Sequence, residues 1–321
     1  MQATGTIFQL WETALPNFID LYSTEELIDL YRVFDIARVF PSDECLSLID
    51  DKISKTLNDI PLSYVSQLHH SLANTGRHLR EDFLSNITLH IEKNTSNMQA
   101  NDLANALFFL MVNALIKDEK NPTPLMHEIR GRLEGCPDMD DGRKRRIIQF
   151  SQCFDLFCAH EIPRTPDNGS PLERSVRDLF NSVGYMIAPQ PEELKNHGSY
   201  VDFPLKHGMH RFLTEVDGPT HFMHQYKDGH FKPVYVDGQT IIKTAVHAKL
   251  CPEDRVLRLP LATCKYLLSY TGREVASDIL PQLFNGLSNA PHGAYFIDLE
   301  YKEDNPEPNL VALDFFKLVR S

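Results

Sequence analysis

The sequence lacks the features that mark membrane, secreted and disulfide-rich proteins. No window approaches the roughly 18 consecutive apolar residues that a membrane span needs. The first 31 residues contain no Lys or Arg, whereas signal and transit peptides carry basic residues. The six cysteines form no C-x-x-C pair, which favours reduced thiols in a chain of this length. A cytoplasmic protein without membrane contact is therefore predicted, and an organellar or host-delivered protein would need another route.

The sequence also lacks a net positive charge, because acidic residues outnumber basic ones. The formal net charge is −12, of which −8 falls in residues 1–160 and −4 in residues 161–321. Nucleic-acid binders usually carry a basic surface because phosphate contacts supply most of the affinity, so any RNA contact must be local, and the acidic charge leaves room for a protein partner. The one dense basic run is Arg143, Lys144, Arg145 and Arg146. It is the candidate RNA contact, with an import signal or a solvated helix face as alternatives.

What the first half does contain is a repeated helical pattern. Residues 23–60 align with residues 61–98 at an offset of 38, and a further unit follows from Leu103. Apolar residues spaced by 3 and 4 predict one buried stripe on each of two helices per unit. The aligned apolar pairs are Leu27/Val65, Leu30/Leu68, Phe34/Leu72, Cys45/Phe83, Leu46/Leu84, Ile49/Ile87 and Ile53/Ile91. Three to four such units predict an α-solenoid; the alternative is an irregular helical domain.

A change of pattern marks a boundary at EIPRTPDNGSP (residues 161–171), which is rich in proline and turn-forming residues. We therefore predict a helical domain over residues 1–160 and a second domain over residues 161–321. Ser170 and Pro171 are expected to begin a helix. Strands are predicted at YMIAPQ, SYVDFPL, HRFLTEVDG and RVLRLPL, a helix at QTIIKTAVHAKLC, a turn region at residues 227–238, a long helix at REVASDILPQLFNGL, and edge strands near the C-terminus. This order predicts an α/β sandwich around a mixed sheet.

Three carboxylates fall on two of these strands. Glu215 and Asp217 share one face of the strand at residues 210–218, and a hairpin would bring Asp202 close to Glu215. Clustered carboxylates repel one another, and a divalent cation such as Mg²⁺ resolves the repulsion, so Asp202 and Glu215 are candidate metal ligands. Lys243 could stabilise charge on a phosphate, and His221 could carry a proton. The alternative is that Asp217 belongs to a turn and that Glu215 forms a structural salt bridge with Lys243.

At these residues the sequence resembles a known family. YVDFPL, FLTEVDGPTHF, DGQTIIKTAVHAKL and RVLRLPL together resemble the RAP domain over roughly residues 170–270. That family is similar to the restriction-endonuclease-like fold with its P-D…(D/E)-x-K signature, and it typically follows helical repeats, as in FAST kinase-like and octotricopeptide-repeat proteins. The resemblance matches Asp202 and Glu215 to the acidic signature residues. Asp217 stands in the lysine position, so that role would pass to Lys243.

The resemblance implies RNA binding in RNA metabolism, with the helical repeats and the RAP-like domain gripping single-stranded RNA. We prefer this interpretation and leave two others open. One is a Mg²⁺-dependent endoribonuclease in which Asp202 and Glu215 hold the metal and Asp217, His221 and Lys243 assist. The other is a protein-interaction module that keeps a nuclease-like scaffold without catalysis.

Overall fold

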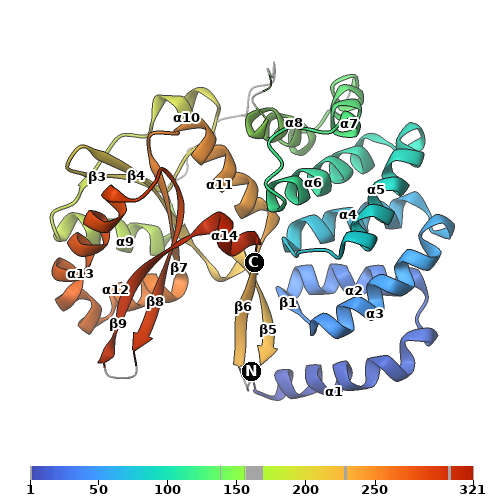
Figure 1. Cartoon of the computed structure of the whole chain (residues 1–321), viewed down its shortest axis with the longest axis horizontal. Coiled ribbons are helices and arrows are strands. Elements are labelled where there is room, and N and C mark those ends of the chain that lie inside the picture. The colour runs from blue at the N-terminus through green and yellow to red at the C-terminus, as the bar shows by residue number, and fades with distance from the viewer. Residues whose placement is uncertain are drawn as a thin grey trace. The chain divides into compact units, whose positions relative to one another are not determined.

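A computed structural model of the chain describes residues 2–137, 139–154, 156, 169–227, 230–302 and 305–320. The fold is mixed α/β (Figure 1). The chain forms two compact units, which we call the helical unit (Met1–Cys158 and Thr220–Ile242) and the sheet unit (Ala159–Pro219 and Lys243–Ser321). The predicted domains, 1–160 and 161–321, place residues 220–242 in the second domain, whereas in the structure they belong to the helical unit. Most of the predicted boundary segment, residues 161–171, lies outside the described residues.

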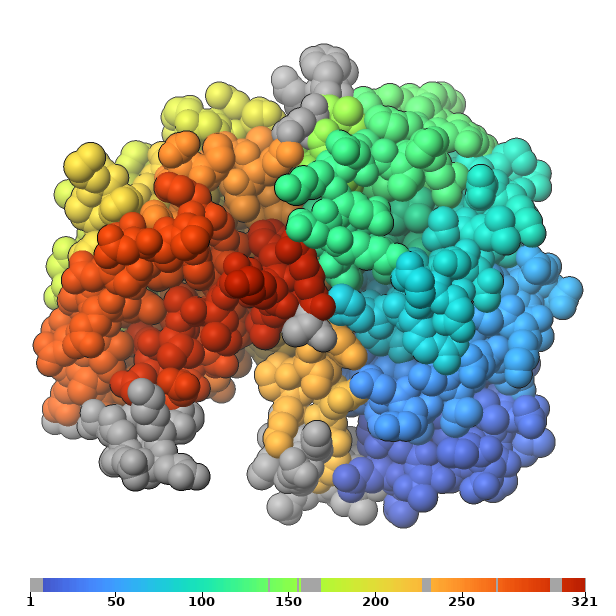
Figure 2. Space-filling view, viewed as in Figure 1, coloured from blue at the N-terminus to red at the C-terminus, as the bar shows by residue number. Residues whose placement is uncertain are grey.

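The helical unit is built from a series of packed helices. Their bounds are α1 (Gln2–Phe18), α2 (Thr24–Ala37), α3 (Asp43–Thr56), α4 (Leu62–Thr75), α5 (Glu81–Asn94), α6 (Ala100–Ile116), α7 (Pro124–Glu134) and α8 (Asp141–Cys153). Helix α2 packs on α4, α4 on α6 and α6 on α8, while α1, α3 and α5 pack in the same order. Figure 2 shows the blue-to-green side chains of successive helices in contact.

The 38-residue period of the sequence reappears as hydrogen bonds between equivalent helices. Gln67 Nε2 donates to Asp29 Oδ1 over 3.0 Å, and Asn105 Nδ2 donates to Ser66 Oγ over 3.1 Å. These partners are 38 and 39 residues apart. The aligned apolar residues are buried, apart from the partly exposed Leu30. The predicted helices and their apolar stripes are therefore confirmed.

The helical unit also contains a three-stranded sheet, and the prediction of a turn region over residues 227–238 was wrong. Strands β5 (Phe222–Lys227) and β6 (His230–Val236) pair antiparallel, and β1 (Val39–Phe40) pairs parallel with β5. Backbone contacts tie the hairpin to the helices, since the amide of His224 donates to the carbonyl of Arg38 over 2.9 Å.

The sheet unit is organised around a six-stranded mixed sheet of order β2-β3-β4-β7-β8-β9. The strands are β2 (Met186–Ile187), β3 (Phe203–His207), β4 (His210–Asp217), β7 (Arg255–Pro260), β8 (Gly293–Lys302) and β9 (Asn305–Asp314). The helices are α9 (Pro171–Ser182), α10 (Glu192–Asn196), α11 (Gly238–Leu250, which begins in the helical unit), α12 (Leu261–Leu268), α13 (Tyr270–Asn289) and α14 (Phe315–Arg320). The predicted strands and the two long helices are confirmed, whereas the short α10, α12 and α14 were not predicted. The last predicted edge strand, LVALDFFKLV, is a strand only as far as Asp314 and continues as α14.

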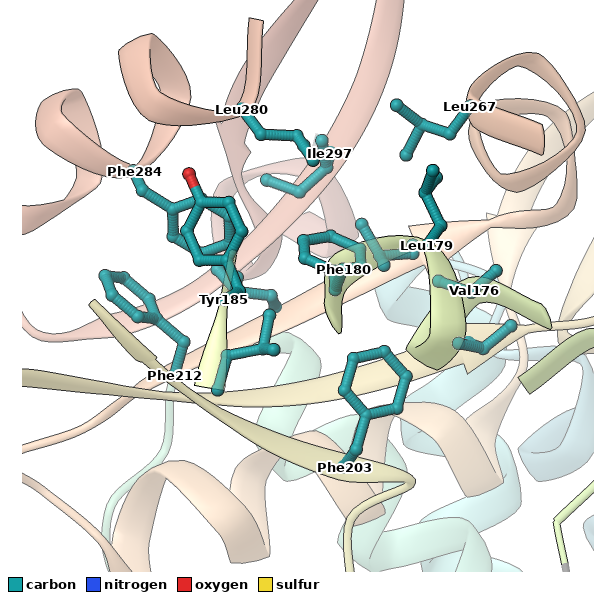
Figure 3. Packing of buried hydrophobic residues seen from close by; sticks show 14 of the residues in the cluster. Val176, Leu179, Phe180, Tyr185, Phe203, Phe212, Leu267, Leu280, Phe284 and Ile297 are labelled. Carbon is teal, nitrogen blue, oxygen red and sulfur yellow. The ribbon is translucent and has the colours of Figure 1, made fainter. Parts of the chain in front are cut away.

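Two features of the sheet unit position its polar residues. Ser170 begins α9 as predicted, because its hydroxyl accepts from the amide of Glu173. An apolar cluster packs α9, α12 and α13 against the sheet and includes Phe180, Phe212 and Phe284 (Figure 3). Phe212 and Val216 of β4 belong to this cluster. Because side chains alternate along a strand, Glu215 and Asp217 face away from it, as the sequence predicts.

Candidate functional site

The pairing of β3 with β4 brings Asp202 beside Glu215. Phe203 is opposite Thr214, and continuing this antiparallel register places Asp202 opposite Glu215. The amide of Val216 donates to Asp202 Oδ2 over 2.6 Å. The strand prediction was wrong by a few residues, because β3 begins at Phe203 and Asp202 directly precedes it. The predicted proximity of the two carboxylates is nevertheless present.

Lys243 binds one oxygen of Glu215, and the ring of His247 faces the other. Lys243 Nζ lies 2.6 Å from Oε2, and His247 Nδ1 lies 3.4 Å from Oε1. Lys243 and His247 are four residues apart on α11, so they share one face of that helix. Glu215 and His247 are buried, whereas the side chain of Lys243 is 39% exposed. The structure therefore agrees with the alternative interpretation in which Glu215 forms a salt bridge with Lys243.

Asp217 has a partner of its own. Arg258 on the neighbouring strand β7 donates through Nε to Asp217 Oδ2 over 2.8 Å and through Nη2 to Oδ1. The third donor of Arg258, Nη1, lies 2.9 Å from Thr244 Oγ1. Both charged side chains are 1% exposed. This is a buried bidentate ion pair, so the structure places Asp217 in the interior.

The donor set fits Mg²⁺ poorly. Lys243 occupies one oxygen of Glu215, the His247 ring faces the other, and one oxygen of Asp202 accepts a backbone N–H. Arg258 engages Asp217, the third acidic group. Over the described parts of the chain, no group of three or more His, Cys, Asp or Glu side chains is arranged to hold a metal ion. The Lys243 ammonium therefore balances Glu215, one of the two predicted metal ligands, and the Arg258 guanidinium balances Asp217.

Asp202 is the carboxylate whose charge is least compensated. Partial burial and the neighbouring Glu215 carboxylate raise the pKa of Asp202 to about 7. Burial lowers the pKa of Lys243, but the Glu215 and Asp202 carboxylates outweigh it and the net direction is upward. Burial lowers the pKa of His247 well below its usual range, and Lys243 and Arg258 add to this effect. The buried surroundings therefore favour the neutral form of the imidazole and raise the pKa of the neighbouring carboxyl.

Replacing Asp202 with Asn is expected to make the protein more resistant to unfolding at pH 8, with a smaller advantage at pH 5. The folded-state pKa of about 7 exceeds the ordinary 3.8. The stability contributed by this carboxyl is therefore fully present below pH 3.8 and is lost as the pH rises through 7. Allowing for solvent screening, the advantage of the variant should reach about 2 kcal/mol. Urea unfolding of both proteins between pH 5 and pH 9 measures it, and equal pH dependence of the two curves would contradict it.

His221, the remaining catalytic candidate, belongs to the helical unit. Its Nδ1 lies 2.8 Å from Thr240 Oγ1. The amide of Thr240 in turn donates to Asp237 Oδ1 over 2.7 Å. His221 is thus part of the polar contacts at the start of α11, and the structure groups Asp202, Glu215, Asp217 and Lys243 in the other unit.

The basic run lies on α8, where its members have different surroundings. Arg143 pairs with Asp140 at 3.5 Å and Lys144 with Asp141 at 3.9 Å. The guanidinium of Arg146 lies 3.6 Å from the centroid of the Phe108 ring, and burial with the neighbouring Arg145 lowers the pKa of Arg146 to about 10. Arg145 is exposed. The run therefore presents less free positive charge than its sequence implies.

A row of polar side chains follows the repeat on α2, α4 and α6. Asp29, Gln67 and Asn105 occupy equivalent positions 38 residues apart. Gln67 binds Asp29, and Asn105 Nδ2 donates to Ser66 Oγ over 3.1 Å. Asp29 is exposed, and the two amides are partly exposed. We call Asp29, Gln67 and Asn105 the polar row.

Beside the polar row lies a column of planar groups with the same period. His70, Phe108 and Arg146 are also spaced by 38 residues. The rings of His70 and Phe108 have centroids 5.9 Å apart, and Arg146 stacks on Phe108. Their repetition shows that equivalent positions of successive helices stay in register.

Sequence reasoning missed several of these residues. His247 follows Lys243 by one helical turn, and that spacing could have identified it. Arg258 is a cation within the apolar strand RVLRLPL, where a buried position requires a charged partner. The polar row could have been found by extending the 38-residue alignment from apolar to polar positions.

Comparisons with known proteins add no assignment. No protein-family model matches the chain, and no curated protein is significantly similar to it. None of the described helices combines the length and the apolar composition that a bilayer crossing requires.

Proposed function

We propose that the protein binds single-stranded RNA and acts in RNA metabolism, in the stability, processing or translation of its target. In this proposal the helical unit is an α-solenoid, and the sheet unit is a RAP-like domain with an endonuclease-like α/β sandwich. The RAP-like domain would grip RNA rather than cleave it, because its carboxylates are held by Lys243 and Arg258.

The polar row carries this proposal. Helical-repeat proteins that read RNA present two or three side chains per repeat to one base. Asn and Gln amides are suited to this task because each offers a donor and an acceptor to a base edge. Gln67 and Asn105 place such amides at equivalent points of successive repeats, 38 residues apart. Few repeats imply contact with only a few bases, and thus modest sequence preference.

The RNA-binding proposal predicts that Gln67→Ala together with Asn105→Ala weakens binding at least about tenfold, since each amide–base contact contributes about 1–3 kcal/mol. Fluorescence anisotropy with a labelled single-stranded RNA of mixed sequence measures the Kd. Asn86→Ala is the matched control, because Asn86 is an exposed amide on α5 outside the polar row. Circular dichroism checks that the double variant is folded.

The salt dependence gives a second readout. Each phosphate contact to single-stranded RNA adds about 0.7 to the slope of log affinity against log salt. With Arg145 as the exposed member of the basic run, a shallow slope is expected, and Arg145→Glu should reduce it further. Absence of binding by the wild type would overturn the proposal in favour of a protein-interaction module. Mg²⁺-dependent cleavage that Glu215→Ala abolishes would overturn it in favour of an endoribonuclease.

A further inference from the structure

Three side chains in the sheet unit lie next to one another in the order serine, histidine and acid, as in the catalytic triads of serine hydrolases. Ser199 Oγ lies 2.9 Å from His247 Nε2, and His247 Nδ1 lies 3.4 Å from Glu215 Oε1. Ser199 lies between α10 and β3, His247 on α11 and Glu215 on β4. A serine, a histidine and an acid connected in this order recur on unrelated folds, and they are recognised by geometry rather than by position in the sequence.

The surroundings of His247 fix its tautomer. Nδ1 of His247 and Oε1 of Glu215 are both buried and lie 3.4 Å apart, and within the described residues neither atom forms a hydrogen bond. They face each other, so the stable arrangement places the proton on Nδ1, directed at the carboxylate. Nε2 is then the unprotonated nitrogen, and the Ser199 hydroxyl donates to it. This is the orientation in which an imidazole can remove a proton from a serine.

The carboxylate is held in place from its other side. Lys243 Nζ binds Oε2 of Glu215 over 2.6 Å, which leaves Oε1 turned toward the ring. Glu215 and Lys243 are thus positioning residues that act through His247. Exposure also divides the roles, since Glu215 and His247 are buried and Ser199 is half-buried. Of these three side chains, Ser199 is therefore the one that a dissolved substrate can reach.

We propose that Ser199 is the nucleophile of a site that hydrolyses carboxylic esters, with His247 as its general base. Oγ of Ser199 attacks the ester carbonyl carbon while its proton passes to Nε2 of His247. The C–O bond to the leaving alcohol breaks, and the alcohol takes that proton, which leaves an acyl-serine. Water then attacks the acyl carbon and gives a proton to Nε2, which returns it to Oγ as the carboxylic acid departs. This activity is independent of RNA binding.

Covalent labelling of the full-length protein tests the proposal. A fluorophosphonate probe is expected to label wild type at Ser199, located by peptide mass spectrometry, and p-nitrophenyl acetate should be hydrolysed with an initial burst. Ser199→Ala should lose both signals. Ser182→Ala, at an exposed serine of α9 in the same unit, should keep both. Absence of Ser199 labelling in the folded wild type would overturn the proposal.

Two further variants separate catalysis from folding. His247→Gln should slow labelling at least about 100-fold, the usual contribution of a general base, and an unchanged rate in the folded variant would contradict the assignment. Glu215→Gln should lower kcat for ester hydrolysis without raising KM, because Glu215 is predicted not to touch the substrate. A raised KM with unchanged kcat would contradict its positioning role. Ser199→Ala should still bind RNA as wild type does, so failure of either proposal leaves the other testable.

Discussion

Replacing Arg258 with Met is expected to lower the free energy of unfolding of the sheet unit by about 3–5 kcal/mol. Arg258 and Asp217 form a bidentate pair in which both side chains are 1% exposed. Burial alone would lower the pKa of Arg258, but the Asp217 carboxylate outweighs it and raises that pKa. Removing the cation takes the Arg258 guanidinium away from the buried Asp217 carboxylate and also deprives Thr244 Oγ1 of this donor. This is the largest single loss that we expect in the sheet unit.

The sequence offers a way to assign this loss to one unit. The chain has a single tryptophan, Trp11, which lies in the helical unit against Phe34. Tryptophan fluorescence during urea unfolding therefore follows the helical unit, whereas far-ultraviolet circular dichroism follows both. Arg258→Met should move the circular-dichroism transition to lower urea and move the fluorescence transition less.

Two controls distinguish the loss of the ion pair from the loss of an arginine side chain. Arg174→Met removes an exposed arginine of α9 in the same unit and should change stability by less than about 0.5 kcal/mol. The double variant Asp217→Leu with Arg258→Met replaces the pair by apolar groups and should recover most of the loss. If Arg258→Met is no more harmful than Arg174→Met, the pair does not stabilise the sheet unit.

Local patterns in the sequence were sufficient for most helices and strands. The spacing of Leu27, Phe34, Ile49 and Ile53 predicted buried helical stripes, because that spacing depends only on the 3.6-residue period. The 38-residue repeat, also visible in the sequence, recurs in the hydrogen bond between Asp29 and Gln67. The β5–β6 hairpin was missed because residues 222–236 mix apolar and polar residues without the clear alternation of a half-buried strand.

Only the contact between the two strands that follow each other in the sequence could be predicted for the candidate site. Asp202 and Glu215 lie on consecutive strands, so an antiparallel pairing was the simple expectation, and it is present. Arg258 lies opposite Glu215 on β7, a parallel neighbour that the chain reaches only after α11. Its pairing with Asp217 depends on a long-range register that no local pattern specifies. The charges of the carboxylate cluster were visible in the sequence, and their partners were not.

The position of the hairpin depends on two glycines in the helical unit. Gly76 ends α4 with φ 61°, and a Cβ there would lie 1.9 Å from the carbonyl oxygen of Val236. A Cβ at Gly238 would lie 2.1 Å from the carbonyl oxygen of Ala73. The end of β6 and the start of α11 thus approach the end of α4 more closely than any side chain permits.

Gly76→Ala is expected to destabilise the helical unit by about 3 kcal/mol, which combines about 1–2 kcal/mol for a left-handed non-glycine residue with about 1–3 kcal/mol for overpacking. Gly131→Ala is the matched control, because Gly131 lies inside α7 with no atom within 4 Å of an added Cβ. It should stabilise the unit by up to about 1 kcal/mol through helix propensity. The urea midpoint reported by Trp11 fluorescence should therefore move in opposite directions for the two variants.

Hydrogen exchange of backbone amides should show which strands the Gly76→Ala substitution destabilises. The new methyl group must separate α4 from Val236, so amides of β5 and β6 should exchange faster while those of β4 and β7 in the sheet unit keep their wild-type rates. The hydrogen bond from the amide of His224 to Arg38 should also weaken, because it holds β5 to the segment after α2. If exchange in β5 and β6 is unchanged while Gly131→Ala behaves as expected, then residues 220–242 do not pack against α4 through Gly76.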